Sequence, residues 1–543
     1  MTLTIDGFSA EFWAWRVRCQ PRSSDDIMRV TRPPGWLPEL GPAALAAQRR
    51  QRDAFEEALA ALERSVHGAV GSSVADRVDV RLLRSALNRV TWELDVLRWW
   101  AQPAAYVEAA LGPVFDVLLP PGVDAARLAE VGRFLGNVPA VVAAAEEVLP
   151  AVAQAELVDL AVGSLAGIRD RLLTVVAALG RAVPGAPALD EVASTAADAL
   201  DRLRAFLVRL RPGLPHWEPV GRDAFDAFLR DVACIPLDSD ALLAIGVREF
   251  QRASVLERLE SHRHRDRPTQ SLPADAASQI ARHERDELAV RAFLEAEGLL
   301  SQPATLRHYR NAPLPDYLAP LSFLGVTDDL TGLADPDGDA TSYLPDPAPG
   351  LPYFDAANAI DPRAGIVHEG VHAQQLALAW KHPRPVRRRY YDSGANEGIA
   401  FYNEEMMLAA GLFEDAPHTR TVIYNFMRLR ALRVQIDVGL ATGAMSIAQA
   451  REALRTRVPM DEATADEEAV FFAQTPGQAM TYQIGKTQIL AFLADAAVCR
   501  PELTLRELHD SLWRNGNVPI ALHRWELLGL TDELDAIGLR PAG

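Results

Sequence analysis

The chain has 543 residues, of which 49% are hydrophobic and 24% charged, the balance of a soluble globular protein with a sizeable core. Its formal net charge of −18 argues against general attraction to nucleic acid or to anionic membrane surfaces. The three cysteines, Cys19, Cys234 and Cys499, are far apart and odd in number, which favours neither a disulfide framework nor a thiolate metal site.

The start of the chain, MTLTIDGFSAEFWAWRVRCQ, lacks the basic stretch and apolar run of a secretory signal. No run approaches 18 uninterrupted apolar residues, so the sequence predicts no membrane span. We therefore expect a cytoplasmic protein.

The first half of the chain is typical of successive helices. Apolar residues recur there at three- and four-residue spacing, and Pro or Gly marks the joins. No repeat of fixed period is present. The predicted helical segments are 42–66, 75–119, 125–149, 155–179, 190–210, 223–259 and 275–299.

Two histidine-containing segments near the middle of the chain are interpreted as surface. The run 262–268, HRHRDRP, is predicted to be a solvated connector rather than a metal-binding pair. His283-Glu284 begins like a zinc motif but lacks a second histidine four residues on, and we assign it to a helix surface.

The composition changes between residues 305 and 361, which are rich in Pro, Asp and Tyr. A small sheet is predicted near 304–345, with β-prone pieces at 306–309 and 321–326. The acidic run 335–339, DPDGD, lacks the ligand spacing of a calcium loop and is interpreted as a solvated turn. Long helices are predicted to resume at Pro362.

The motif His368-Glu369-Gly370-Val371-His372 carries the functional hypothesis. Helical residues four apart share a face, so both imidazoles can reach one ion, and Glu369 can take a proton from metal-bound water. This set of ligands suits zinc. The alternative is two helical histidines that only pack or face solvent.

A third ligand is predicted at Glu397, after 24 intervening residues that follow His372. Two histidines need another protein ligand, and a glutamate on a following helix is a standard one. Gly398 and Ala400 would let that helix approach the motif helix closely. The alternative for Glu397 is an acidic first turn of a helix.

The segment 396–404, NEGIAFYNE, resembles the third-ligand segment of the gluzincin zinc metallopeptidases, especially the zinc aminopeptidases. With H-E-x-x-H before it and P-G-Q-A-M-T-Y-Q-I-G at 476–485 after it, the chain is similar to the bacterial family called domain of unknown function 885. Many members of that family insert Pro-Gly before a double histidine, whereas this chain has the compact motif. The gap to Glu397 is also longer than in the aminopeptidases, so the resemblance implies a ligand role and not a substrate.

Further side chains are assigned supporting roles. Tyr482 is the candidate donor to an oxyanion, with a core tyrosine as the alternative, and Tyr402 is a weaker candidate for the same role. Gln478 lies four residues before Tyr482, on the same face if both are helical. Glu404, seven residues after Glu397, is the candidate to orient a ligand histidine.

Arg428, Arg430 and Arg433 allow two interpretations. They could bind a substrate carboxylate, but the charged face of an amphipathic helix is the simpler explanation.

The sequence thus predicts a mainly α-helical protein with a gluzincin-like arrangement around a deep cleft. Its regions would be an N-terminal helical one, 1–270, and a catalytic one, 271–543, or else a single continuous domain. The expected function is zinc-dependent hydrolysis of a peptide or small amide by Glu369-activated water. The alternatives are a metal-dependent enzyme of another class, a scaffold with an idle metal site, and a binding protein. The oligomeric state is not predicted.

Overall fold

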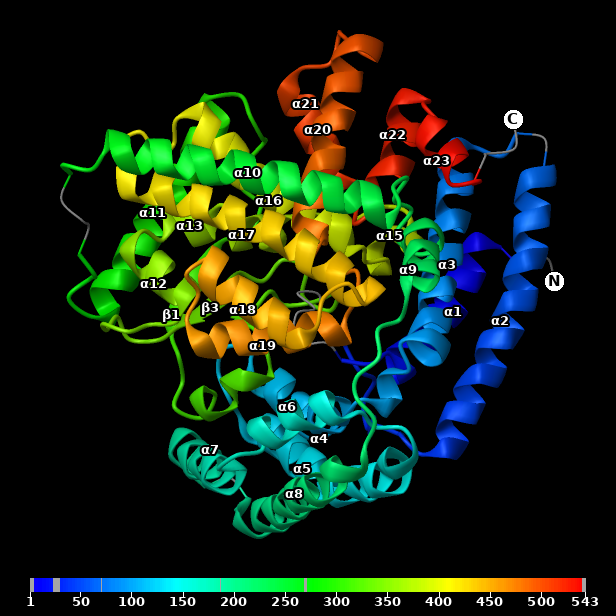
Figure 1. Ribbon diagram of the computed structural model, residues 1–543, viewed down its shortest axis with the longest axis vertical. Coiled ribbons are helices and arrows are strands. Elements are labelled where there is room, and N and C mark those ends of the chain that lie inside the picture. Colours follow the sequence, from blue (N-terminus) through cyan, green and yellow to red (C-terminus); the bar gives the residue numbers. More distant parts are fainter. Residues whose placement is uncertain (1–3, 23–29, 70, 186, 268–270, 540–543) are drawn as a thin grey trace.

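The computed structural model describes residues 4–22, 30–69, 71–185, 187–267 and 271–539 (Figure 1). It confirms a mainly helical protein with one small sheet. The helices of the first part are α1 (Ile5–Cys19), α2 (Pro42–Gly68), α3 (Val74–Thr91), α4 (Pro103–Leu118), α5 (Ala125–Val148), α6 (Ala155–Ser164), α7 (Ile168–Ala182), α8 (Asp190–Leu210) and α9 (Arg222–Asp231).

The second part begins with two long helices and continues, after the sheet, with helices to the end of the described chain. They are α10 (Ser239–Arg263), α11 (Ala276–Ala296), α12 (Tyr353–Ile360), α13 (Arg363–Ile366), α14 (Glu369–Trp380), α15 (Pro385–Arg389), α16 (Ser393–Ala410), α17 (Pro417–Thr442), α18 (Ile447–Arg457), α19 (Glu462–Gln474), α20 (Thr481–Cys499), α21 (Leu505–Arg514), α22 (Ile520–Leu528) and α23 (Asp532–Ala536).

The connector predicted at 262–268 is partly helical, because α10 continues to Arg263 before the chain turns. Pro268 of that run and residue 270, where the two predicted regions meet, lie outside the described residues. The division of the chain at this point stays a prediction.

The small sheet lies where the sequence predicts it. Its strands are β1 (Tyr309–Pro313), β2 (Asp328–Asp329) and β3 (Ala340–Leu344), in the order β1-β3-β2. β1 pairs parallel with β3, and β2 pairs antiparallel with it. The β-prone piece 321–326 is not a strand, because Ala319–Leu324 forms a 3₁₀ helix whose Leu321 and Leu324 point into the core.

Two large apolar cores organise these elements. The first joins α2, α3, α4, α5, α7 and α8 and also takes in Tyr343 of β3, Val386 of α15 and Trp525 of α22. The second surrounds α14, α16, α20 and α21. In Figure 1 the long helices α10 and α17 lie side by side above α18 and α19, with α5, α7 and α8 below. Residues from both ends of the chain therefore share one core.

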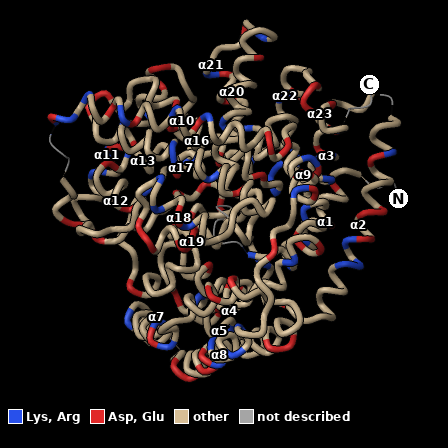
Figure 2. The backbone as a smooth tube through the Cα atoms, viewed as in Figure 1, with Lys and Arg blue, Asp and Glu red and all other residues tan. Residues whose placement is uncertain are grey.

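Acidic and basic residues are interspersed along the helices, and no broad basic face is visible in the view of Figure 2. By length and hydropathy alone, one described segment, Ala125–Ala151, could cross a membrane. This segment is α5 with a short 3₁₀ extension, and its Val131, Leu135 and Val142 are buried in the first core. The criterion of uninterrupted apolar residues does not detect this segment, because Arg and Glu side chains interrupt the apolar run.

Candidate metal centre

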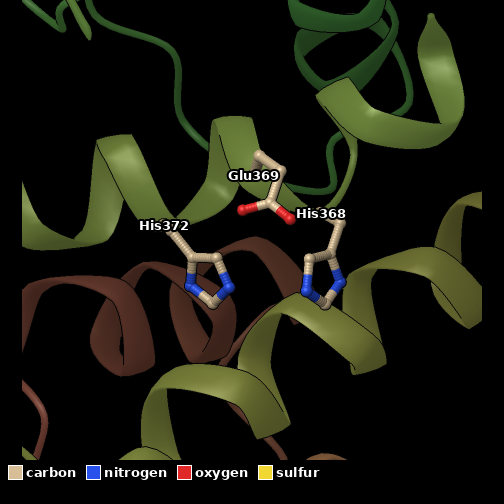
Figure 3. Close-up of side chains that lie close together, drawn as sticks. All are labelled: His368, Glu369 and His372. Atoms are coloured by element: carbon tan, nitrogen blue, oxygen red, sulfur yellow. The ribbon is translucent and has the colours of Figure 1, made fainter. Parts of the chain in front are cut away.

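The H-E-x-x-H motif lies at the beginning of α14 rather than in the middle of a helix. His368 is the N-terminal cap residue, and Glu369 and His372 lie in the first turns. The His372 amide donates to the His368 carbonyl at 3.4 Å, which holds both imidazoles on one side. One ligand atom from each of these three side chains lies within 4.8 Å of the others. Figure 3 shows the Glu369 carboxylate above the gap between the two rings.

The carboxylate of Glu397, from α16, completes this cluster. Its Oε2 lies 3.4 Å from Nε2 of His368 and 3.3 Å from Nε2 of His372. Ligands about 2.0–2.1 Å from a zinc ion in a tetrahedral site lie about 3.3 Å from one another. The two measured separations therefore have the size that a shared zinc ion requires.

The polar atoms of this cluster are buried and short of hydrogen bonds. His372 is fully buried and Glu397 is 1% exposed. Within the described part of the chain, neither ring nitrogen of His372 nor Oε2 of Glu397 has a hydrogen-bond partner. Buried polar atoms without partners are costly, and a bound cation would satisfy these. The residues therefore fit a metal ion.

Glu404 lies behind His368, two turns beyond Glu397 on α16. Its Oε1 is 2.7 Å from Nδ1 of His368 and 2.8 Å from Nη2 of Arg430 on α17. Burial lowers the pKa of His368, but its contacts with the carboxylates of Glu397 and Glu404 outweigh burial and raise that pKa to about 9. The pKa of Glu397, which burial would raise, is held far below its usual value by His372 and His368.

Two side-chain hydrogen bonds hold α16 against α14 and the residue that precedes its cap. Asn396 donates to Oε1 of Gln375 at 2.6 Å, and Asn403 donates to the carbonyl of Val367 at 2.7 Å. Asp392 caps α16 by accepting from the amide of Ala395. Because the bonds of Asn396 and Asn403 lie on either side of Glu397, they fix its position along the helix relative to the two histidines.

Gly398 was predicted to let its helix approach the motif helix closely, but the helix that it approaches is a different one. A Cβ on Gly398 would lie 2.6 Å from the Cα of Gly485, and one on Gly485 would lie 2.0 Å from the carbonyl oxygen of Gly394. Gly394 and Gly398 of α16 therefore admit α20, and Gly398 does not serve the approach of the motif helix α14. This contact joins two of the sequence motifs backbone to backbone and places Tyr482 beside the histidines.

Tyr482 stacks on His368, with ring centroids 6.0 Å apart and an angle of 14° between the planes. Its ring also lies under the guanidinium groups of Arg430 and Arg433, at 5.4 and 5.0 Å. Gln478 does not share a helical face with Tyr482, because α20 begins only at Thr481 and Gln478 belongs to the preceding turn.

Tyr402 and His283 lie elsewhere than the sequence suggests. The hydroxyl of Tyr402 is 2.8 Å from Nε2 of His509 on α21, so it is directed to that helix. His283 is not on a helix surface but 2% exposed, packed against the ring of Tyr309. The strand β1 and the short helix α13 pack against α11, and this contact is not predictable from the local pattern of charges.

The arginines of α17 do not form a charged outer face. Arg430 is 5% exposed and Arg433 is 7% exposed. Arg433 pairs with Glu468 of α19, and only Arg428, which pairs with Glu257, is more accessible. Arg430 is a part of the site that the sequence interpretation missed. Its apolar neighbours Leu429 and Leu432 were the available signal of burial.

A cavity of about 1030 Å³ lies between the first and second parts of the chain. Tyr482, Gln478 and Arg433 line it on one side, and Trp13, Arg89 and other residues of the first part line the opposite side. His368, Glu369 and His372 are not among its lining residues. The cavity thus reaches the candidate centre at Tyr482.

The sequence matches a family described as a bacterial protein of unknown function (DUF885) over residues 35–289 and 345–526. The chain belongs to this family. No curated protein matches it.

Two solved structures share the fold, and both are described as a "putative lipoprotein". One, from Shewanella oneidensis and described as of unknown function, has a TM-score of 0.69 at 16% identity, covering 96% of this chain and 99% of that one. The other, from Colwellia psychrerythraea, has a TM-score of 0.65 at 13% identity, with coverage of 96% and 99%. These likenesses concern the fold.

Proposed function

We propose that this DUF885 protein is a zinc-dependent hydrolase of peptide or small amide bonds, with the ion held by His368, His372 and Glu397. The observation that carries the proposal is the position of Glu397. Its Oε2 lies 3.3–3.4 Å from both imidazole nitrogens in a buried site and has no hydrogen bond within the described residues. Gluzincin metallopeptidases use the same types of ligand, and we propose that the site is of the gluzincin type.

The balance of charge supports a divalent ion. Three carboxylates, those of Glu369, Glu397 and Glu404, face the site against one guanidinium, that of Arg430. When both imidazoles are neutral, as ligation of a metal ion requires, two negative charges remain in surroundings that solvate them poorly. A doubly charged cation neutralises them, and imidazole with carboxylate is a set that zinc accepts.

A bound zinc ion would supply a Lewis acid that polarises a carbonyl and acidifies water. Glu369 is half-buried and directed to the gap between the histidines, so its carboxylate is the group placed to accept a proton there and to return it to a leaving amine. Tyr482 lies at the end of the cavity, and its phenol is the candidate donor to an oxyanion. Arg430 and Glu404 keep His368 in place.

A binding protein or a scaffold with an idle ion is the second candidate. It is favoured by one observation, that the lining of the large cavity includes Tyr482 but neither histidine. In that case a ligand would occupy the cavity without reaching Glu369.

The deciding measurement is metal content by mass spectrometry on protein purified without chelator or metal-affinity tag. We expect about one zinc ion per chain, which His368→Ala removes and His67→Ala, a change at an exposed histidine, retains. Glu369→Gln should keep the metal and lose turnover of a peptide library. Wild-type protein that stays metal-free after dialysis against zinc would rule out the hydrolase. Zinc binding without turnover of any peptide would favour the second candidate.

A further inference from the structure

Asp437 is a carboxyl group in the core that forms no part of the metal cluster. It lies in the apolar run 434–440 of α17 and is fully buried. Its Oδ1 accepts from the amide of Gly477 at 2.8 Å, and its Oδ2 accepts from the amide of Met480 at 2.9 Å. Both oxygens are therefore bonded to one turn, residues 476–480, which precedes α20.

The conformation of this turn leaves backbone amides that need a hydrogen-bond acceptor from elsewhere in the chain. Gly477 has φ +94°, a conformation that favours glycine. The amides before α20 have no intrahelical partner, since a helix leaves its first donors unsatisfied. A Cβ on Gly477 would also lie 2.3 Å from the ring of Phe228 on α9. The turn is thus held by Asp437 from one side and by Phe228 from the other.

The turn leads directly into the helix that carries Tyr482. Met480, whose amide bonds to Asp437, is the N-terminal cap residue of α20, and Tyr482 follows two residues later. The backbone contact between Gly398 and Gly485 fixes the distance of α20 from α16, and a buried hydrogen bond from Ser393 to Thr481 at 3.1 Å ties the start of α20 to α16. The bonds to Asp437 fix the turn just before that start, two residues from the phenol.

We propose that Asp437 is a positioning residue, which holds the turn 476–480 so that the phenol of Tyr482 lies over His368 at the edge of the cavity. The consequence for catalysis rests on the proposed hydrolase function, whereas the placement of Tyr482 does not.

The surroundings of Asp437 support a positional role over a contribution to stability. Burial raises its pKa to about 7, although the amides of Gly477, Met480 and Ala479 act in the opposite direction. No cation among the described residues contributes to that balance. A carboxyl group that is buried without a cation adds little to the stability of a fold. We therefore attribute the role of Asp437 to the geometry that it imposes on the turn.

The test compares Asp437→Asn, Tyr482→Phe and the double variant on a peptide substrate found with the wild type. Asn keeps the shape of the side chain but replaces one acceptor with a donor. We expect kcat to fall 10- to 100-fold in Asp437→Asn, with KM within twofold and zinc content unchanged, because small misplacements of a reacting group cost this much. The double variant should be no slower than Tyr482→Phe. Multiplied effects, or a loss confined to KM, would overturn the proposal.

A second readout does not depend on activity. Hydrogen exchange at residues 476–482 should be at least tenfold faster in Asp437→Asn. Asp510→Asn is the matched control, because Asp510 also accepts a backbone amide, that of Ser301 at 3.0 Å, but at a different helix. If Asp437→Asn does not fold, Phe228→Leu, which loosens the same turn, should give the same local increase. Unchanged exchange overturns the proposal. Faster exchange in a protein without turnover supports the placement of Tyr482 and contradicts only the hydrolase.

Discussion

Glu404 is the residue whose role follows most directly from the geometry of the site. It touches Nδ1 of His368 and is held in turn by Arg430, so it fixes the ring orientation and leaves Nε2 as the nitrogen available to the proposed ion. Tyr402, on the same helix, does not join the site. At 3.6 residues per turn, Glu404 lies about 20° from Glu397 around the axis, whereas Tyr402 lies about 140° away.

We expect Glu404→Gln to weaken zinc binding about 10- to 100-fold, because a histidine that loses its outer partner is a poorer and less oriented ligand. Competition with a chromophoric chelator measures this affinity. Glu405→Gln is the matched control, since the neighbouring carboxylate pairs with Lys486 and Arg252 instead of His368. Equal affinities in the wild type and Glu404→Gln would remove Glu404 from the site.

The residues of the candidate site were predictable to the extent that their spacing is local. His368, His372, Glu397 and Glu404 follow from intervals along one or two helices. Arg430 and Asp437 come from α17, whose position against α16 and α20 depends on packing between distant segments. A charged residue in an amphipathic pattern does not by itself reveal whether it faces solvent or a buried carboxylate.

At the scale of elements, the pairing of α16 with α20 depends on glycine. Most helices were predictable from periodicity, and the small sheet was predictable from its composition. The breaks inside the predicted segments 75–119, 155–179 and 223–259 were not. Which helices contact one another was not predictable, as the wrong partner for Gly398 shows. The apolar piece 321–326 failed for a related reason, since a short run of Leu, Phe and Val fits a strand or a helical turn equally well.

We expect Gly485→Ala to destabilise the protein by about 1–3 kcal/mol or more, because the added methyl group would overlap the carbonyl of Gly394 and force the two helices apart. Gly180→Ala, in α7 with open space around it, should instead raise stability by about 0.5–1 kcal/mol. Denaturant unfolding of both variants provides the measurement. A Gly485→Ala protein as stable as the wild type would mean that α16 and α20 do not pack this closely.

At the scale of the whole molecule, a buried ion cluster joins distant parts of the chain. Arg387 of α15 is 2% exposed and binds Asp79 of α3 at 2.9 Å and Glu526 of α22 at 2.7 Å. Burial raises the pKa of Asp79, and the ion pair with Arg387 counteracts it. Since α15 lies between α14 and α16 in the chain, this cluster ties the candidate centre to the first part of the chain.

We expect Arg387→Met to cost about 3–5 kcal/mol, because it leaves the carboxylate of Asp79 buried with a weaker set of partners. Arg389→Met, at an exposed position in the same helix, should change stability by less than about 0.5 kcal/mol.

Calorimetry of the wild type should show a single transition, because Val386 and Trp525 belong to the core of the first part. Two separate transitions would instead favour independent domains.

The position of the first motif at the start of α14 has a consequence for how the sequence can diverge. His368 caps the helix, and Glu369, Gly370 and Val371 form its first turn, so the interval between the two histidines is helical throughout. A residue inserted into that interval would break the bond from the amide of His372 to the carbonyl of His368 and would turn one imidazole away from the other. A relative can therefore vary the chain before His368 more easily than the spacing of the histidines, unless α14 begins in a different way.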